Sequence, residues 1–141
     1  MSVALELARR CPPSRSAYSV GAVLVGADGR ELASGYSRDT DELVHAEESA
    51  LAKLAGGDGP GPGVTLYSTL EPCSRRSSRP RPCARLIIDA GIGRVVLAWR
   101  EPALFVAEPG GVELLESAGV EVVELPELAA AARAVNAHLV G

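Results

Sequence analysis

Hydrophobic and polar residues follow two different periods along this chain, one typical of strands and one typical of helices. Short apolar or alternating segments bounded by turn residues predict strands over 20–25, 31–36, 64–68, 94–98 and 120–124. Apolar residues at helical spacing, next to caps or prolines, predict helices over 2–10, 45–54, 83–90, 111–118 and 127–139. The pattern therefore changes from a strand pair to regular alternation of strand and helix.

The connections between these elements predict how the strands are arranged. Asp28-Gly29 is a hairpin signal between the first two strands, so these two should pair antiparallel. The later strands are separated by helices, which favours parallel crossovers. We therefore expect a mixed five-stranded sheet with helices on both faces, a three-layer α/β/α domain. The glycine- and proline-rich stretch 56–63 should be a loop.

The composition is that of one globular domain. At 141 residues and 47% hydrophobic, the chain can bury a single core, and we assign residues 1–141 to one domain. No apolar stretch approaches the ~18 residues of a membrane span, and the N-terminus has the wrong order of charges for a secretory signal. We expect a cytoplasmic protein with no membrane partner. The net charge of −4 and the 4% aromatic content argue against nucleic acid as a partner.

Three residues have side chains and positions suited to a metal. His45 stands in His45-Ala46-Glu47 at the start of a predicted helix, and Cys73 and Cys83 each follow a proline. Cys83 opens the helix over 83–90, where backbone N–H groups and the helix dipole favour a thiolate. One imidazole and two thiolates suit Zn2+, and three protein ligands leave its fourth position to water, as in catalytic sites.

Glu47 is the candidate catalytic residue. Zinc lowers the pKa of its bound water toward ~7, and a carboxylate that is not a ligand can then move protons. Glu47 would take a proton from the water and deliver it to the ring nitrogen and the departing amine. A lone histidine or cysteine is more often a core or surface residue, and we interpret Cys11 and His138 in this way. The complete set, by contrast, has the residue types and order of the zinc-deaminase signature.

These motifs resemble a known group of enzymes. His45-Ala46-Glu47, Thr69-Leu70-Glu71-Pro72-Cys73-Ser74 and Pro82-Cys83-Ala84 are similar to the motifs of the cytidine deaminase-like superfamily. Nine residues separate the two cysteines, which resembles the deaminase half of the bacterial riboflavin-biosynthesis deaminase/reductase rather than the Cys-x-x-Cys of cytidine and tRNA adenosine deaminases. Segments 86–96 and 111–122 are also similar to that family. The chain ends where the reductase domain of that family would begin.

The resemblance implies a fold, an activity and an assembly. The fold would be the three-layer cytidine deaminase-like sandwich, with one zinc per chain. The activity would be hydrolytic removal of the exocyclic amine of a pyrimidine-type ring, on a phosphoribosylated diaminopyrimidine as in riboflavin biosynthesis. Members of this superfamily commonly form dimers or tetramers, so a homodimer or higher homo-oligomer is expected.

An arginine-rich loop supports a phosphorylated small molecule as the substrate. Four arginines and no acidic residue lie between the two cysteines: Arg75, Arg76, Arg79 and Arg81. Arginine suits bidentate phosphate contact, and the loop is tethered at both ends to the predicted metal site. The alternative is a solvated surface loop without a ligand.

Two other interpretations of the function stay open at this stage. Segment 16–21, Ser-Ala-Tyr-Ser-Val-Gly, is similar to free cytidine deaminases, which favours a cytosine nucleoside or nucleotide contacted by Tyr18 and Ser19. In this segment Ala17 replaces the asparagine with which the riboflavin family contacts its substrate. A protein of a different class, a noncatalytic zinc-stapled binding module, would keep the fold without the chemistry.

Overall fold

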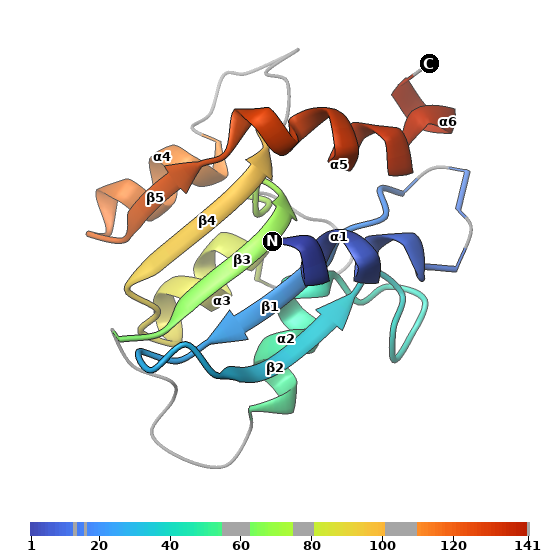
Figure 1. The fold of residues 1–141 in the computed structure, drawn as a ribbon. Coiled ribbons are helices and arrows are strands. Elements are labelled where there is room, and N and C mark those ends of the chain that lie inside the picture. Colours follow the sequence, from blue (N-terminus) through green and yellow to red (C-terminus); the bar gives the residue numbers. More distant parts are fainter. Residues whose placement is uncertain (13, 16, 55–62, 75–80, 101–109, 141) are drawn as a thin grey trace.

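The computed structural model describes residues 1–12, 14–15, 17–54, 63–74, 81–100 and 110–140 (Figure 1). Five strands form one sheet in the order β2-β1-β3-β4-β5. Their bounds are β1 Gly21–Val25, β2 Glu31–Tyr36, β3 Thr65–Leu70, β4 Arg94–Trp99 and β5 Glu121–Glu124. β1 pairs antiparallel with β2 and β3, whereas β3, β4 and β5 are parallel to one another. The mixed sheet predicted from one hairpin and later crossovers is confirmed.

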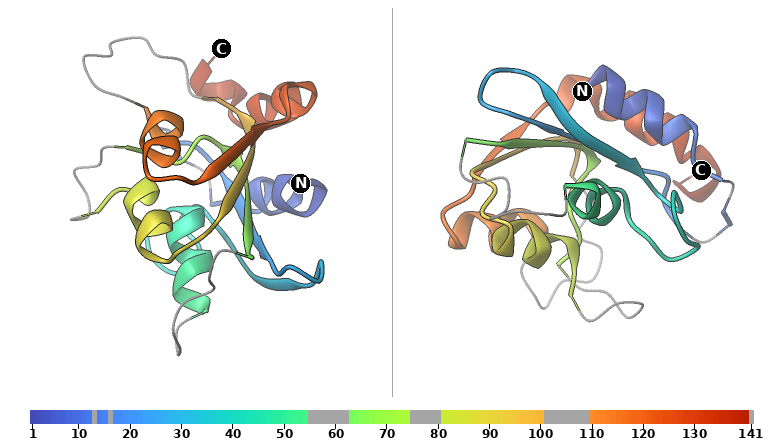
Figure 2. Two further views of the ribbon diagram at one scale, coloured as in Figure 1. Left: turned by 90° about the vertical axis from the view of Figure 1, so that its left-hand side faces the viewer. Right: turned by 90° about the horizontal axis from the view of Figure 1, so that it is seen from below.

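Helices cover both faces of this sheet. Their bounds are α1 Ser2–Arg9, α2 Ala46–Lys53, α3 Cys83–Asp89, α4 Gly111–Ser117, α5 Ala129–Val135 and α6 Ala137–Val140. α1 and α5 pack together on one face, and α2, α3 and α4 lie side by side on the other (Figure 2). The three-layer α/β/α arrangement expected from the sequence is therefore confirmed.

The C-terminal segment differs from the single helix predicted over 127–139. A 3-10 turn, Pro126–Leu128, comes first, and α5 and α6 are separated at Asn136. The Asn136 side-chain amide donates hydrogen bonds to the carbonyls of Ala132 and Ser19, and its oxygen accepts from the Ser19 N–H. The two bonds to Ser19 join this C-terminal segment to a distant part of the chain, which helix propensity along the sequence does not reveal. The loop predicted over 56–63 lies, except for Gly63, outside the described residues.

Two glycines allow helices to pack closely on the hairpin. A Cβ at Gly21 would lie 1.9 Å from the carbonyl oxygen of Ala4, and one at Gly35 would lie 2.7 Å from the carbonyl oxygen of Ala46. Only glycine fits at such distances. The missing side chains let α1 approach β1 and let α2 approach β2. The N-terminus of α2, which carries the predicted histidine ligand, is thereby held against the sheet.

Strand direction gathers the predicted motifs at one end of the sheet. Because β1 is antiparallel to β2 and β3, the carboxyl ends of β2 to β5 and the amino end of β1 all lie at the same end. The segments at this end are 17–20, which lead into β1, 37–45 after β2, and 71–73 after β3. Ligand sites of α/β sheets are typically found outside the carboxyl ends of strands. A functional site is therefore expected at this end of the sheet.

Candidate metal centre and active site

Three potential metal ligands from separate segments meet at this end of the sheet. His45 precedes the first residue of α2, Cys73 follows β3, and Cys83 begins α3. The imidazole Nδ1 of His45 lies 3.4 Å from the Cys83 sulfur and 3.7 Å from the Cys73 sulfur. All three ligand atoms are within 4.8 Å of one another, so these residues are positioned to hold a metal ion.

The geometry and donor types of this set fit zinc. With Zn–S bonds of about 2.3 Å and Zn–N bonds of about 2.0–2.1 Å, tetrahedral coordination places nitrogen and sulfur roughly 3.6 Å apart. The two observed N···S distances lie on either side of this value. Among the described residues the group has three ligands, which leaves a fourth tetrahedral position for water or substrate. This is the coordination of a catalytic rather than a structural zinc.

Backbone hydrogen bonds hold the two cysteine segments together. The N–H of Cys83 donates to the Cys73 sulfur at 3.2 Å, and the N–H of Ala84 donates to the Cys73 carbonyl at 3.0 Å. Two residues before Cys73, the buried Glu71 carboxylate accepts from the Val112 N–H at 2.8 Å. The first turns of α3 and α4 therefore fix the segment that carries Cys73.

The two thiols have opposite shifts in acidity. The hydrogen bond from Cys83 lowers the pKa of Cys73 to about 4, with further help from His45. The same thiol pairing, burial and the negative charge of Glu47 raise the pKa of Cys83. Burial and the neighbouring negative charge thus oppose the effect of the helix N-terminus on Cys83. A divalent cation between the sulfurs would stabilise both thiolates.

Glu47 lies next to the three ligands without belonging to their group. It occupies the first turn of α2 and is only 4% exposed. One carboxylate oxygen, Oε1, accepts a hydrogen bond of 2.7 Å from the hydroxyl of Ser68 on β3. Its charge also acts on Cys83, which places the carboxylate beside the metal position.

A pocket of about 340 Å³ opens onto this centre. Its walls come from the three segments that strand direction gathers, and they include His45, Glu47 and Cys73. The full lining of described residues is Ala17, Tyr18, Val20, Ser37, Arg38, Glu42, Leu43, Val44, His45, Ala46, Glu47, Leu70, Glu71 and Cys73. A substrate in this pocket would therefore meet His45, Cys73 and the buried carboxylate of Glu47 together.

The predicted substrate residues before β1 have different environments. Tyr18 lines the pocket, and its ring packs edge-on against Trp99 with centroids 5.5 Å apart. Ser19 is buried, and its hydroxyl oxygen accepts a hydrogen bond of 2.8 Å from Arg38. Tyr18 is thus placed to contact a ligand, while Ser19 helps to hold the pocket wall in place.

The arginine loop can be placed only in part. Arg75, Arg76 and Arg79 lie outside the described residues. Arg81 is exposed, and its guanidinium forms an ion pair with Asp89 on α3.

Cys11 and His138 do not belong to the metal group. The Cys11 sulfur lies 3.5 Å from the carbonyl oxygen of Val20. A ring nitrogen of His138 lies 2.8 Å from the carbonyl oxygen of Ser14.

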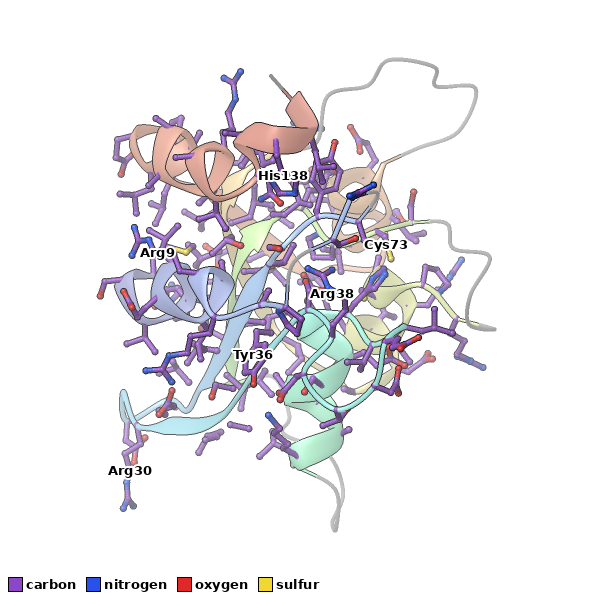
Figure 3. The ribbon with its side chains drawn as sticks, turned by 90° about the vertical axis from the view of Figure 1, so that its right-hand side faces the viewer. Arg9, Arg30, Tyr36, Arg38, Cys73 and His138 are labelled. Atoms are coloured by element: carbon purple, nitrogen blue, oxygen red, sulfur yellow. The ribbon has the colours of Figure 1, made fainter. Side chains whose placement is uncertain are left out.

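Arg38 is a pocket residue that the sequence did not reveal. Its guanidinium donates to the carbonyls of Pro12 and Tyr18 and to the hydroxyl of Ser19. Arg38 belongs to the segment that leads into α2, and its guanidinium reaches the segment that follows α1 (Figure 3). Its φ of 60° lies in the left-handed region, which is uncommon outside glycine. Such a conformation and such distant partners leave no pattern in a single sequence.

The sheet, the His–Cys–Cys group and the buried glutamate together are the features of a zinc-binding deaminase family. The chain belongs to the family described as the cytidine and deoxycytidylate deaminase zinc-binding region, whose model matches residues 1–99. This membership argues against the alternative of a noncatalytic zinc-stapled module. No helix within the described part of the chain has the length and apolarity of a membrane span.

Curated relatives point to one branch of this family. The chain is 42% identical over 126 residues to a diaminohydroxyphosphoribosylamino-pyrimidine deaminase of Schizosaccharomyces pombe, covering 88% of this chain and 31% of that protein. It is 40% identical over 127 residues to the riboflavin biosynthesis protein RibD of Aquifex aeolicus, covering 86% and 33%. The chain thus spans about a third of the length of the curated relatives it matches.

Solved structures give the same result. A diaminohydroxyphosphoribosylaminopyrimidine deaminase/reductase of Thermotoga maritima matches with a TM-score of 0.73 and 34% identity, over 99% of this chain and 38% of that one. The Aspergillus oryzae Rib2 deaminase matches with a TM-score of 0.78 and 27% identity, over 99% and 87%. A dCMP deaminase from cyanophage S-TIM5 matches with a TM-score of 0.66 and 25% identity, over 88% and 92%. The cytidine deaminase-like fold expected from the motifs is confirmed.

Proposed function

We propose that this chain hydrolyses the exocyclic amine of a phosphoribosylated diaminopyrimidine, replacing it with oxygen and releasing ammonia. The observation that carries the proposal is the convergence of His45, Cys73 and Cys83 next to a pocket that is lined by His45, Cys73 and the buried Glu47. The choice of substrate is supported by relatives that are named for this deamination. A structure of the Rib2 deaminase of Aspergillus oryzae, 26% identical, was determined in complex with DARIPP.

The proposed mechanism assigns one task to each residue. His45 Nδ1 and the sulfurs of Cys73 and Cys83 would hold the zinc, which supplies Lewis acidity and makes water a nucleophile near neutral pH. Glu47 takes one proton from the attacking water and delivers it to the ring nitrogen, and it then takes the second proton from the same oxygen and delivers it to the amine, which leaves as ammonia. Burial of the Glu47 carboxylate excludes bulk water from this transfer. The products are the ring carbonyl and ammonia.

Direct turnover assays test the proposed substrate. Ammonia release is measured with the diaminopyrimidinone ribosyl phosphate, its dephosphorylated form, cytidine, CMP and dCMP. We expect kcat/KM to be highest for the diaminopyrimidinone ribosyl phosphate. A preference for CMP or dCMP would instead support the second candidate, which the likeness to a dCMP deaminase favours. No ammonia from any of these compounds would contradict the proposed function.

We further propose that arginines of the 75–81 loop bind the substrate phosphate. Loss of a charge-assisted hydrogen bond of ~1.5–3 kcal/mol lowers kcat/KM roughly 10–150-fold. Alanine variants of Arg75, Arg76 and Arg79 should show this loss with the phosphorylated substrate and almost none with the dephosphorylated one. Arg81→Ala should show a smaller loss, because Asp89 already pairs with Arg81.

A matched control and the salt dependence separate phosphate binding from general effects. Arg85 is exposed on α3 and is not among the pocket residues, so Arg85→Ala should leave kcat/KM for both substrates nearly unchanged. The loss in the loop variants should shrink as salt screens the phosphate. Equal losses with both substrates would indicate a folding role for the loop, and no loss in any variant would indicate a solvated loop.

Other expectations from the sequence stay predictions. These are that residues 1–141 form one deaminase domain, that the chain forms a homodimer or higher homo-oligomer, and that it works in the cytoplasm. The proposed partner is a small molecule. Tyr18 would contribute its ring to the substrate pocket, and Ser19 would act through the wall that it shares with Arg38.

A further inference from the structure

Ser68 places a hydroxyl against the proposed proton shuttle. Its side chain is fully buried on β3, and its Oγ lies 2.7 Å from Oε1 of Glu47 and 2.8 Å from the carbonyl oxygen of Leu70. A serine hydroxyl has one hydrogen, so it donates to one of these two acceptors at a time. Buried side chains and short distances on both sides leave Ser68 little freedom to point elsewhere.

The position of Ser68 in the sheet makes it a rigid support. β3 is an inner strand, and Ser68 pairs with Ala22 of β1 on one side and with Leu97 of β4 on the other. Glu47, by contrast, stands on the first turn of α2, on a long side chain with several rotatable bonds. A hydrogen bond to an ionised carboxylate is among the stronger ones and is directional. The hydroxyl can therefore select one orientation of the carboxylate.

Cys83 is another described side chain that faces this carboxylate. As a zinc ligand it would be a thiolate and would have no proton to donate. The hydroxyl of Ser68 is a donor to Glu47 that metal binding would not remove.

We propose that Ser68 is a positioning residue that acts through Glu47. It holds Oε1 and leaves the second carboxylate oxygen to receive the proton from water and pass it to the substrate. The contact can persist after transfer, because the proton is then on the second oxygen and Oε1, now the carbonyl oxygen of the carboxyl group, still accepts from the Ser68 hydroxyl. The inference rests on the proposed function of Glu47 as the proton shuttle.

The test is Ser68→Ala, assayed by ammonia release with the diaminopyrimidinone ribosyl phosphate or, if that is not turned over, with dCMP. We expect kcat to fall ~10–100-fold, the range for losing a hydrogen bond to a charged group, with KM and zinc content changed less than about twofold. The matched control is Thr69→Val, because Thr69 is also a buried β3 hydroxyl but accepts from the Gly21 N–H, away from Glu47. Thr69→Val should lower the Tm while retaining kcat.

A double variant shows whether Ser68 acts through Glu47. Adding Ser68→Ala to Glu47→Gln should lower the remaining kcat by less than about threefold, since the shuttle is already gone. Equal losses in both backgrounds, or a normal kcat in Ser68→Ala while Glu47→Gln is impaired, would overturn the Ser68 proposal and leave the proposed function intact. Normal turnover in Glu47→Gln, or no turnover of either substrate by the unaltered chain, would overturn both.

Discussion

Glu47→Gln is expected to lower kcat by ~10²–10⁴-fold while the fold and the bound zinc are retained. Glutamine has nearly the same shape as glutamate and can still accept from Ser68, but it cannot carry a proton between water and the substrate. The measurement is kcat together with zinc content and Tm. The expected combination is a large fall in kcat with about one zinc per chain in both proteins.

Glu48→Gln is the matched control for this prediction. Glu48 is the next residue on α2, and its carboxylate accepts a hydrogen bond of 3.2 Å from the His45 N–H. A glutamine oxygen can accept the same bond, as in helix capping boxes, so most of the turnover should remain. Loss of zinc from Glu47→Gln would show that Glu47 is a ligand, and near-normal turnover would show that the proton moves by another route.

Removal of the metal centre is expected to abolish turnover. Cys83→Ala should reduce zinc from about one per chain to a small fraction and lower kcat by more than ~10⁴-fold, because both the Lewis acid and the activated water are lost. Dialysis of the unaltered protein against a chelator should have the same effect, and added zinc should restore activity. The measurements are elemental analysis and ammonia release.

Cys11→Ala is the control for nonspecific thiol effects. Cys11 is half-buried near the Val20 carbonyl and lies outside the metal group, so this variant should keep its zinc and its turnover. Full activity in a zinc-free protein would contradict the catalytic role of the metal. A Cys73–Cys83 disulfide in the native protein would contradict the ligand assignment itself.

The metal group could be predicted because its residues lie in short local motifs. His45 and Glu47 are two positions apart at the start of a helix, and each cysteine follows a proline. What supports them could not be predicted in this way. The contact between Ser68 and Glu47 joins residues 21 positions apart on different elements, and the contact between Ser19 and Asn136 spans 117 positions. The hydrophobic period of a single sequence indicates local structure, but it does not indicate contacts between distant residues.

In the fold, too, some features follow from neighbouring residues, whereas others involve contacts between distant segments. The hairpin at Asp28-Gly29 follows from turn chemistry, and Gly29 has the positive φ of 85° that such turns need. The helix is interrupted at Asn136 although the surrounding alanines favour continuation. The Asn136 side chain bonds to the Ala132 carbonyl of its own helix and also to Ser19, 117 positions away. Propensity alone therefore predicts the helix but not its interruption.

The hydrogen bonds from Cys83 and Ala84 to Cys73 close the base of the loop that joins the two cysteine ligands. Neither bond uses a side chain from within segment 74–82. Doubling the length of a closed loop costs only about 0.6 kcal/mol in entropy, so this segment can change length and sequence at little cost to ligand geometry. Metal affinity and substrate specificity can therefore change independently of each other. Exchange of segment 74–82 between deaminases offers a way to redesign specificity around an unchanged zinc centre.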